Sequence, residues 1–218
     1  MQETIILTLN NMMASSPLLI TLIPILGDVF VFSYPIYLIY LYFSHPENMS
    51  RWKKIFHISE EKTQKNNALT IFFAAATGVI MNYIIKFFVT EQRPYHVIDL
   101  AVNPKESLIL SSIPTDSFPS DHATVGMSIA LTTLILGYRY HNTQMIKIGW
   151  IFIAFTLIMN ISRITIGVHR PADILWGMGV GIIAAVLLTY DPVYHFLSKK
   201  IYTPVMKFQE YIFGKIMK

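Results

Sequence analysis

The sequence predicts an all-α integral membrane protein, a bundle of about five transmembrane helices with interfacial helices at both ends of the chain. Two observations support this fold class. Hydrophobic residues make up 53% of the 218 positions and charged residues only 14%, with a mean hydropathy of +0.48, which is typical of a polytopic membrane protein. Apolar runs also recur at about the 20-residue length that a spanning helix needs. The chain has no cysteine, which excludes a disulfide framework and a thiolate site.

Five apolar runs give the expected spans. The first, residues 17–43, is interrupted only by Gly27 and Asp28. We expect a helix break there, near the outer surface, with a functional role for Asp28 as the alternative. Ahead of this run, residues 4–15 mix apolar side chains with two asparagines and predict an interfacial helix. No basic n-region precedes it, so we expect no cleaved signal peptide. The other four spans are expected at residues 68–89, 123–138, 148–161 and 174–190.

The remaining segments are expected to complete one domain. After Asp191 apolar residues alternate with lysines, which predicts basic helices lying on a membrane surface. Residues 90–121 are the longest hydrophilic stretch, and we expect an outward loop there. Because no internal repeat or linker is found, residues 1–218 are expected to form a single membrane-embedded domain. Its motif-bearing core is placed at about residues 68–190 and its basic tail at about residues 191–218.

The basic residues are unevenly distributed along the chain. Of the 17, 12 fall within residues 44–67, within residues 139–147 and in the tail from residue 199 onward. Cytoplasmic loops collect Lys and Arg, and five spans would place these three regions on one side. The expected orientation is therefore N-terminus outside and C-terminus in the cytoplasm. On this view the net charge of +4 faces anionic lipid and does not indicate nucleic-acid binding.

The first charged motif is Lys86-x6-Arg93-Pro94, at the end of the second expected span. Proline disfavours helix at the residue before it, so Lys86 should end the helix and Arg93 should lie in the turn above. Arginine offers phosphate a planar fork of donors, and lysine offers a point charge. The pair can bind one phosphoryl group; the alternative is a snorkelling lysine beside an interfacial arginine.

The second motif, Pro119-Ser120-Asp121-His122, precedes the third expected span. Proline followed by Ser and Asp is a helix-start signal, and a helix N-terminus presents free N–H groups to an anion. We place Ser120 and Asp121 in the phosphate-binding set. His122 is the expected general acid, which protonates the leaving oxygen. The alternative is an ordinary Ser/Asp cap with an incidental histidine.

The third motif, Ser162-Arg163-x5-His169-x3-Asp173, is the most specific. Pro171 favours a helix that starts there, so His169 should precede the helix and Asp173 should reach back from its first turn. A carboxylate so placed fixes the imidazole tautomer and stabilises the imidazolium. His169 is therefore the expected nucleophile, and Arg163 a further phosphate ligand. The alternative is a capped helix start.

Two other functions use the same residue types. The two histidines and two aspartates of the motifs could ligate a metal, but the neighbouring lysine and arginines would repel a divalent cation and supply the same charge. We therefore expect no metal and no other cofactor. A channel or proton relay would need polar residues continuing through the bilayer, and the inner halves of the spans show few.

Together, the three motifs resemble the phosphate-binding signature of the type 2 phosphatidic acid phosphatase superfamily, in order and at every defining position, over roughly residues 68–190. The resemblance implies a helical-bundle core and metal-independent hydrolysis through a phosphohistidine on His169. It implies His122 as the acid and Asp173 as the orienting partner. The phosphate ligands that it implies are Lys86, Arg93, Ser120 and Arg163.

Within that superfamily, residues 117–124 (SFPSDHAT) resemble the bacterial undecaprenyl-diphosphate phosphatases, which often have Asp at the position of Asp121. The resemblance implies hydrolysis of undecaprenyl diphosphate to the monophosphate for peptidoglycan synthesis, at the outer face of the bacterial cytoplasmic membrane. The expected partners are a lipid phosphate substrate and membrane lipids, with no nucleic acid. A phosphatidylglycerol phosphate or phosphatidate phosphatase and a lipid phosphotransferase remain alternatives. Six-span relatives have an additional N-terminal helix, which this sequence does not show.

Overall fold

The computed structural model describes residues 1–43, 61–104 and 116–216. Over these ranges the structure is helical, and its only β pairing is an isolated antiparallel bridge between Gln92 and Asp116. The elements are α1 (Gln2–Ala14), α2 (Pro17–Val29), a 3₁₀ turn (Phe30–Phe32), α3 (Ser33–Phe43), α4 (Glu61–Phe88), α5 (Pro94–Val97), α6 (Asp121–Arg139), α7 (Thr143–Thr165), α8 (Pro171–Thr189), α9 (Asp191–Leu197), a π-helical turn (Ser198–Tyr202) and α10 (Thr203–Ile216).

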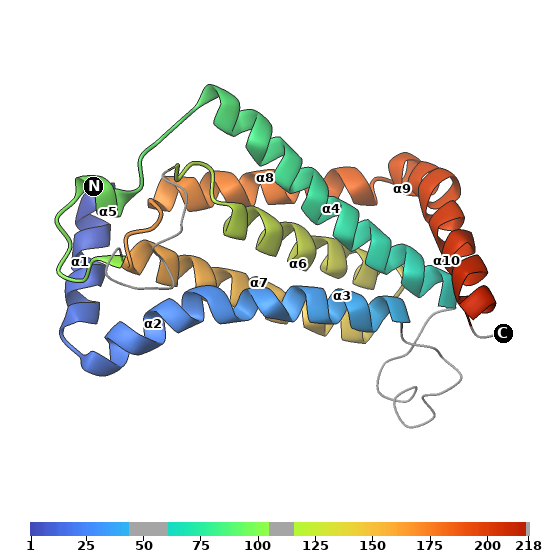
Figure 1. Cartoon of the computed structure of the whole chain (residues 1–218), viewed down its shortest axis with the longest axis horizontal. Coiled ribbons are helices and arrows are strands. Elements are labelled where there is room, and N and C mark those ends of the chain that lie inside the picture. The colour runs from blue at the N-terminus through green and yellow to red at the C-terminus, as the bar shows by residue number, and fades with distance from the viewer. Residues whose placement is uncertain (44–60, 105–115, 217–218) are drawn as a thin grey trace.

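The long helices run lengthwise and form a bundle (Figure 1). Helices α1 and α5 lie at one end of it, and α9 and α10 lie at the other. Within the described residues, four helical segments are long and apolar enough to cross a membrane. This confirms the all-α membrane fold. The four segments are Pro17–Phe43, Thr63–Phe88, Thr143–Thr165 and Pro171–Thr189.

Helix α6, which covers the third expected span, differs from these four. It runs through the bundle and packs against α4, α7 and α8, and most of its residues are buried. Small hydroxyl residues allow helices to approach closely and to bond across an interface. The polar residues of α6 therefore face other helices, and the inner part of the bundle is more polar than we expected. The buried hydroxyl residues of α6 are Thr124, Ser128, Thr132 and Thr133.

The expected helix break at Gly27 and Asp28 was wrong. Helix α2 continues through both residues to Val29, and a 3₁₀ turn of three residues then joins it to α3. Gly27 is buried against α7, where a Cβ would lie 3.6 Å from the Cβ of Ser162. The first span therefore packs on α7 at Gly27, and Asp28 lies next to the end of α7.

Helix α1 lies across the end of the bundle that holds the motifs (Figure 1). The buried Asn10 amide donates to the carbonyls of Val102 and Thr165, both at 3.1 Å, and its oxygen accepts from the Val102 N–H at 3.0 Å. These bonds tie α1 to the loop after α5 and to the end of α7. Around them, an apolar cluster buries Ile6, Met13, Tyr95, Leu100, Ile166 and Val168.

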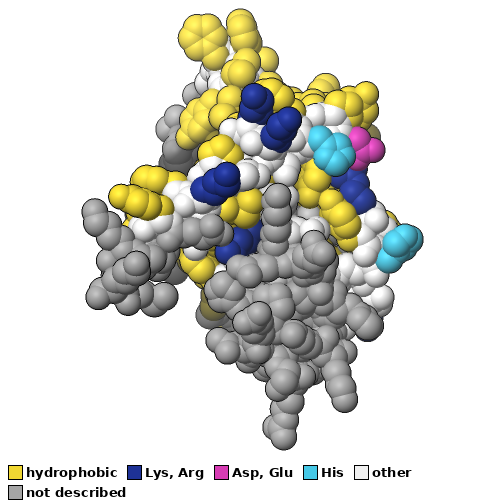
Figure 2. Space-filling view, turned by 90° about the vertical axis from the view of Figure 1, so that its right-hand side faces the viewer, with side chains coloured by type: hydrophobic (Ala, Val, Ile, Leu, Met, Phe, Trp, Pro, Cys, Tyr) yellow, Lys and Arg dark blue, Asp and Glu magenta, His cyan; other side chains and the backbone are white. Residues whose placement is uncertain are grey.

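The tail lies at the opposite end, where Lys and Arg side chains gather beside exposed hydrophobic ones (Figure 2). Arg139 at the end of α6 anchors it, with an ion pair to Asp191 at 3.0 Å and a guanidinium 5.3 Å from the centre of the Tyr194 ring. The side of the membrane on which this end lies stays a prediction. Several residues behind that prediction, including Arg51, Lys53, Lys54 and Lys105, lie outside the described residues. The exposed tail side chains include Phe196, Lys199, Lys200, Lys207 and Phe208.

Candidate active site

The three motifs meet at the end of the bundle that α1 covers. Backbone hydrogen bonds join the segments that hold them, which are far apart in sequence. The Ser117 N–H donates to the Glu91 carbonyl at 2.8 Å, and the Tyr95 N–H donates to the Gly167 carbonyl at 3.1 Å. The segment after α4 is thereby fixed both to the start of α6 and to the turn between α7 and α8.

The turn between α7 and α8 depends on Gly167. Its φ is +74°, in the left-handed region that favours glycine, and a Cβ there would collide with the Leu100 side chain. After this glycine, the N–H groups of Val168 and His169 both donate to the Arg163 carbonyl, at 3.0 and 3.3 Å. The turn therefore brings His169 back toward Arg163 at the end of α7.

The start of α8 has the predicted geometry. Pro171 is its first residue, His169 precedes it, and Asp173 lies in the first turn. The Asp173 carboxylate accepts the Arg170 N–H at 2.8 Å, and the same Oδ2 atom lies 3.6 Å from His169 Nδ1. Both side chains are almost fully buried. The capping carboxylate thus faces one nitrogen of the imidazole ring.

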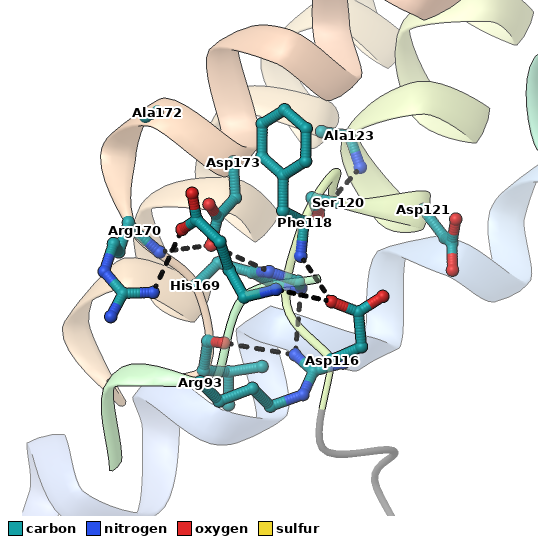
Figure 3. A network of polar contacts seen from close by, with 12 residues as sticks. Arg93, Asp116, Phe118, Ser120, Asp121, Ala123, His169, Arg170, Ala172 and Asp173 are labelled. Carbon is teal, nitrogen blue, oxygen red and sulfur yellow. Dashed lines mark hydrogen bonds and ion pairs between the residues drawn. The ribbon is translucent and has the colours of Figure 1, made fainter. Parts of the chain in front are cut away.

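The other nitrogen of His169 faces Arg93. The distance from Arg93 Nη1 to His169 Nε2 is 3.3 Å, and the same Nη1 donates to the Val168 carbonyl at 3.1 Å. Figure 3 shows the imidazole lying between Arg93 and Asp173. The pKa of His169 is lowered to about 4, mainly by burial; Asp173 opposes this change, and the charges of Arg93 and Arg163 add to it. His169 is therefore a neutral base at pH 7.

His122 pairs with Arg163. Its Nε2 atom lies 2.7 Å from Arg163 Nη2, and the same Nη2 lies 2.5 Å from Asp28 Oδ1. The three side chains come from α6, α7 and α2. The His122 ring is electrostatically coupled to Arg163, His169 and Arg93, so this group lies within electrostatic reach of the other histidine.

Lys86 forms a third group. Its ammonium lies 2.6 Å from Asp121 Oδ2, and Asn82, one helical turn earlier, donates to Asp121 Oδ1 at 2.8 Å. Asp121 lies apart from His169 and points away from it (Figure 3). A carboxylate offers phosphate no donor at neutral pH. Any contribution of Asp121 to phosphate binding therefore acts through Lys86.

Ser120 is the N-cap of α6. Its hydroxyl accepts the Ala123 N–H at 3.5 Å, and its own N–H donates to the Asp173 carbonyl at 3.1 Å. Gly177 makes this contact between α6 and α8 possible, since a Cβ there would lie 2.5 Å from the Ser120 carbonyl oxygen. Ser120 thus fixes the second motif to the third, and its hydroxyl oxygen accepts the capping bond while the O–H can still donate to an anion.

Every predicted site residue lies at this end, in these contacting groups. Together they provide a neutral imidazole with a carboxylate 3.6 Å from its Nδ1 atom, a second imidazole in contact with an arginine, and three cationic side chains. Among the described residues, no three His, Asp or Glu side chains converge as they would around a metal ion. The arrangement suits the transfer of a phosphoryl group to nitrogen, with cations around its oxygens.

Two side chains in these groups were missed or undervalued at the sequence level. Asp28 was visible as a lone carboxylate in an apolar run, which is a functional signal in a membrane span, but its distance from the motifs hid its partner. Asn82 lies four residues before Lys86, the spacing that places two side chains on one helix face. It also contacts Thr124, whose Oγ1 lies 2.9 Å from the amide nitrogen.

Comparisons with known proteins agree with this geometry. The model of the PAP2 superfamily matches residues 67–197, more than half of the chain. Undecaprenyl-diphosphatase BcrC of Bacillus subtilis is 32% identical over 54% of this chain and 55% of its own. The bacitracin transport permease protein BcrC of Bacillus licheniformis is 28% identical over 58% and 57%. An undecaprenyl-diphosphatase of Sulfolobus acidocaldarius is 26% identical over 55% and 52%.

The chain spans about half the length of the curated relatives that it matches. No solved structure matches it. The matched residues contain all three motifs, with His122 in α6, Asp173 in α8 and His169 in the turn between α7 and α8. The chain belongs to the PAP2 superfamily.

Proposed function

We propose that the protein is a metal-independent membrane lipid phosphatase that hydrolyses undecaprenyl diphosphate to undecaprenyl phosphate through a phosphohistidine. One observation carries the proposal. The buried, neutral His169 has Nδ1 toward the Asp173 carboxylate and Nε2 toward the Arg93 guanidinium. A carboxylate behind the ring can stabilise the imidazolium that forms, and a guanidinium beside Nε2 can turn to the oxygens of an arriving phosphoryl group and free the nitrogen for attack.

In the first step, the lone pair of His169 Nε2 attacks the terminal phosphorus. The bond from phosphorus to the bridging oxygen breaks, and protonated His122 gives its proton to that oxygen. Lipid monophosphate leaves, and the phosphoryl group stays on His169. The ring then carries a positive charge, which the Asp173 carboxylate stabilises.

In the second step, water attacks the phosphohistidine. His122, now neutral, takes a proton from the water as the new bond to phosphorus forms. The bond between phosphorus and Nε2 breaks, and inorganic phosphate leaves. His122 is then protonated and His169 is neutral, as at the start.

Charge stabilisation falls to Lys86, Arg93 and Arg163. In phosphoryl transfer the transition-state charge spreads over the equatorial oxygens, and fixed cations there supply most of the catalysis. Asp121 holds Lys86 at 2.6 Å. These side chains do the work of a divalent cation, which is why the reaction is proposed to need none.

The proposed substrate rests on the relatives. Two of them are named undecaprenyl-diphosphatases, and the site lies at the end of a membrane bundle, where a headgroup meets water. We further propose that the N-terminus and the active site face the exterior of a bacterial cytoplasmic membrane and that the basic tail faces the cytoplasm. The product would return a lipid carrier to peptidoglycan synthesis.

A phosphate-release panel on the purified protein tests this proposal. Undecaprenyl diphosphate, phosphatidylglycerol phosphate and phosphatidate are compared, with His169→Ala as the blank. The highest kcat/KM should belong to undecaprenyl diphosphate; a preference for either glycerolipid would replace it as the substrate. Added acceptor lipid should leave phosphate release unchanged. A phosphorylated acceptor among the products would instead identify a phosphotransferase.

A further inference from the structure

We propose that Asp28 is a positioning residue of the active site, which holds the Arg163 guanidinium between the phosphoryl group and His122. The inference rests on the proposed hydrolysis of a lipid phosphate. Asp28 lies outside all three motifs and outside residues 67–197, which the family model matches. The first span would thus add a residue to a site that is otherwise built by the core.

The contact between the two side chains is close. Asp28 Oδ1 lies 2.5 Å from Arg163 Nη2, while the Arg163 side chain is 6% exposed and that of Asp28 is 36% exposed. Removing a guanidinium from water is expensive unless an opposite charge and hydrogen bonds accompany it. Asp28 supplies that charge from the more accessible side, so Arg163 can remain ionised at the end of α7.

Packing fixes where the carboxylate lies. The first span runs beside α7, and contacts on both sides of Asp28 join the two elements. Asp28 therefore sits on a supported stretch of helix rather than on a loop. The contacts are Gly27 with Ser162 (a Cβ on the glycine would lie 3.6 Å from the Ser162 Cβ), Phe30 with Phe155 (stacked rings, 4.3 Å between centres) and Tyr34 with Thr156 (2.9 Å between hydroxyl oxygens).

One nitrogen of Arg163, Nη2, contacts both the Asp28 carboxylate and the His122 ring. Arginine can only donate, so the His122 Nε2 atom, 2.7 Å away, must accept, and the ring proton lies on Nδ1. For Nε2 to deliver a proton to the leaving oxygen, the Arg163 N–H must first turn from the ring toward a phosphoryl oxygen, and the freed Nε2 must take up a proton from solvent, which gives the protonated His122 that begins the proposed reaction. Asp28 holds the other N–H of this nitrogen, so it limits how far the guanidinium can move.

This role affects the transition state more than substrate binding. Arg93 and Lys86 remain to bind the headgroup, whereas a misplaced Arg163 fails to meet the developing charge and continues to occupy the acid. Interactions made only in the transition state change kcat, and uniform binding changes KM. For Asp28→Asn we expect kcat to fall by about 10- to 100-fold, with KM within about threefold of wild type.

The kinetic test compares three variants on undecaprenyl diphosphate. Asp28→Asn should show the fall in kcat, and Asp28→Glu, which keeps the charge, should lie between it and wild type. The matched control is Asp191→Asn, since Asp191 also pairs with an arginine, Arg139 at 3.0 Å, but at the opposite end of the bundle. The control should keep wild-type kcat.

A double-mutant cycle asks whether Asp28 acts through Arg163. In an Arg163→Lys background, Asp28→Asn should cost less than about twofold in kcat, because coupled residues are non-additive. Additive losses would overturn the proposed route. Wild-type kcat in Asp28→Asn would overturn the role itself; should that variant fail to fold, wild-type kcat in Asp28→Glu would do so.

A second readout does not depend on lipid turnover. Orthovanadate, which adopts the five-coordinate geometry of phosphoryl transfer, is titrated against the thermal unfolding of each purified variant. Its affinity should fall in Asp28→Asn about as much as kcat does and stay unchanged in Asp191→Asn. A wild-type protein that binds vanadate but hydrolyses no lipid would refute the proposed function and leave this comparison to decide the role of Asp28. Equal affinities in Asp28→Asn and wild type, or no binding by wild type, would refute the role.

Discussion

The Oδ2 atom of Asp173 lies 3.6 Å from His169 Nδ1 while it accepts the Arg170 N–H at 2.8 Å. One carboxylate oxygen therefore caps α8 and faces the ring. The contacts of this oxygen with the Arg170 N–H and with the His169 ring link the fold of the helix start to the chemistry of the proposed nucleophile.

His169→Ala should abolish turnover, and Asp173→Asn should lower kcat by about 10²- to 10⁴-fold, because an amide cannot stabilise the imidazolium. Both rates are measured by phosphate release. Asparagine can still accept the Arg170 N–H, so thermal unfolding of Asp173→Asn should remain close to that of wild type. Turnover that survives His169→Ala in a folded protein would remove His169 from the mechanism.

The acid limb of the pH profile should lie unusually low. Because burial lowers the pKa of His169 to about 4, the neutral nucleophile persists well below its ordinary pKa of about 6.5. The His169 contribution to kcat/KM should then be lost only as the pH falls through about 4. Arg93→Gln removes a charge that lowers this pKa, so the limb should move to higher pH. A limb near pH 6.5 in both proteins would contradict this interpretation.

Lys86→Met should lower kcat/KM by about 10- to 100-fold, since a charge-assisted contact to phosphate is lost. Asp121→Asn should lower kcat/KM by a smaller factor, because it removes the ion pair that positions Lys86 but keeps the lysine charge. If Asp121 acts through Lys86, the double variant should be no slower than Lys86→Met alone. Additive losses would instead indicate a separate role for Asp121.

Chelators should leave the rate of the purified protein unchanged, because the proposed mechanism assigns charge stabilisation to lysine and arginine. The measurement is initial-rate phosphate release before and after treatment with EDTA and dialysis. A loss of activity that a divalent cation restores would revive the metal alternative. Inorganic phosphate detection must itself be shown to be insensitive to the chelator.

Orientation can be tested by labelling, since the chain has no cysteine of its own. Ala101→Cys, in the exposed loop after α5, should react with an impermeant maleimide in intact cells. Lys200→Cys, in the exposed tail, should react only after permeabilisation. The reverse pattern would place the active site in the cytoplasm.

Part of the site followed from local sequence. His169, Pro171 and Asp173 lie within five positions, so backbone preferences alone predicted which residue precedes the helix and which reaches back. Pro94 likewise predicted that Lys86 lies at the end of a helix and Arg93 in the turn after it. The fold class could also be predicted from the sequence, because composition and the length of apolar runs depend on many residues and not on any single contact.

The remaining contacts depend on how helices face one another. The pairing of Arg163 with both His122 and Asp28 joins three helices, and no spacing along the chain reports their relative rotation. The helix break predicted at Gly27 failed for the same reason. Glycine next to aspartate is an ordinary helix-ending signal, but here both residues lie within α2, which packs on α7 at this point.

The buried hydroxyl residues of α6 have a consequence for biogenesis. A helix with this much polar surface partitions weakly into lipid alone and gains its place by contact with α4, α7 and α8. A nascent chain that ends before α7 would leave these hydroxyls facing hydrocarbon. Truncated products should therefore be cleared rapidly by membrane quality-control proteases, and stable insertion of α6 should await synthesis of the helices that follow it.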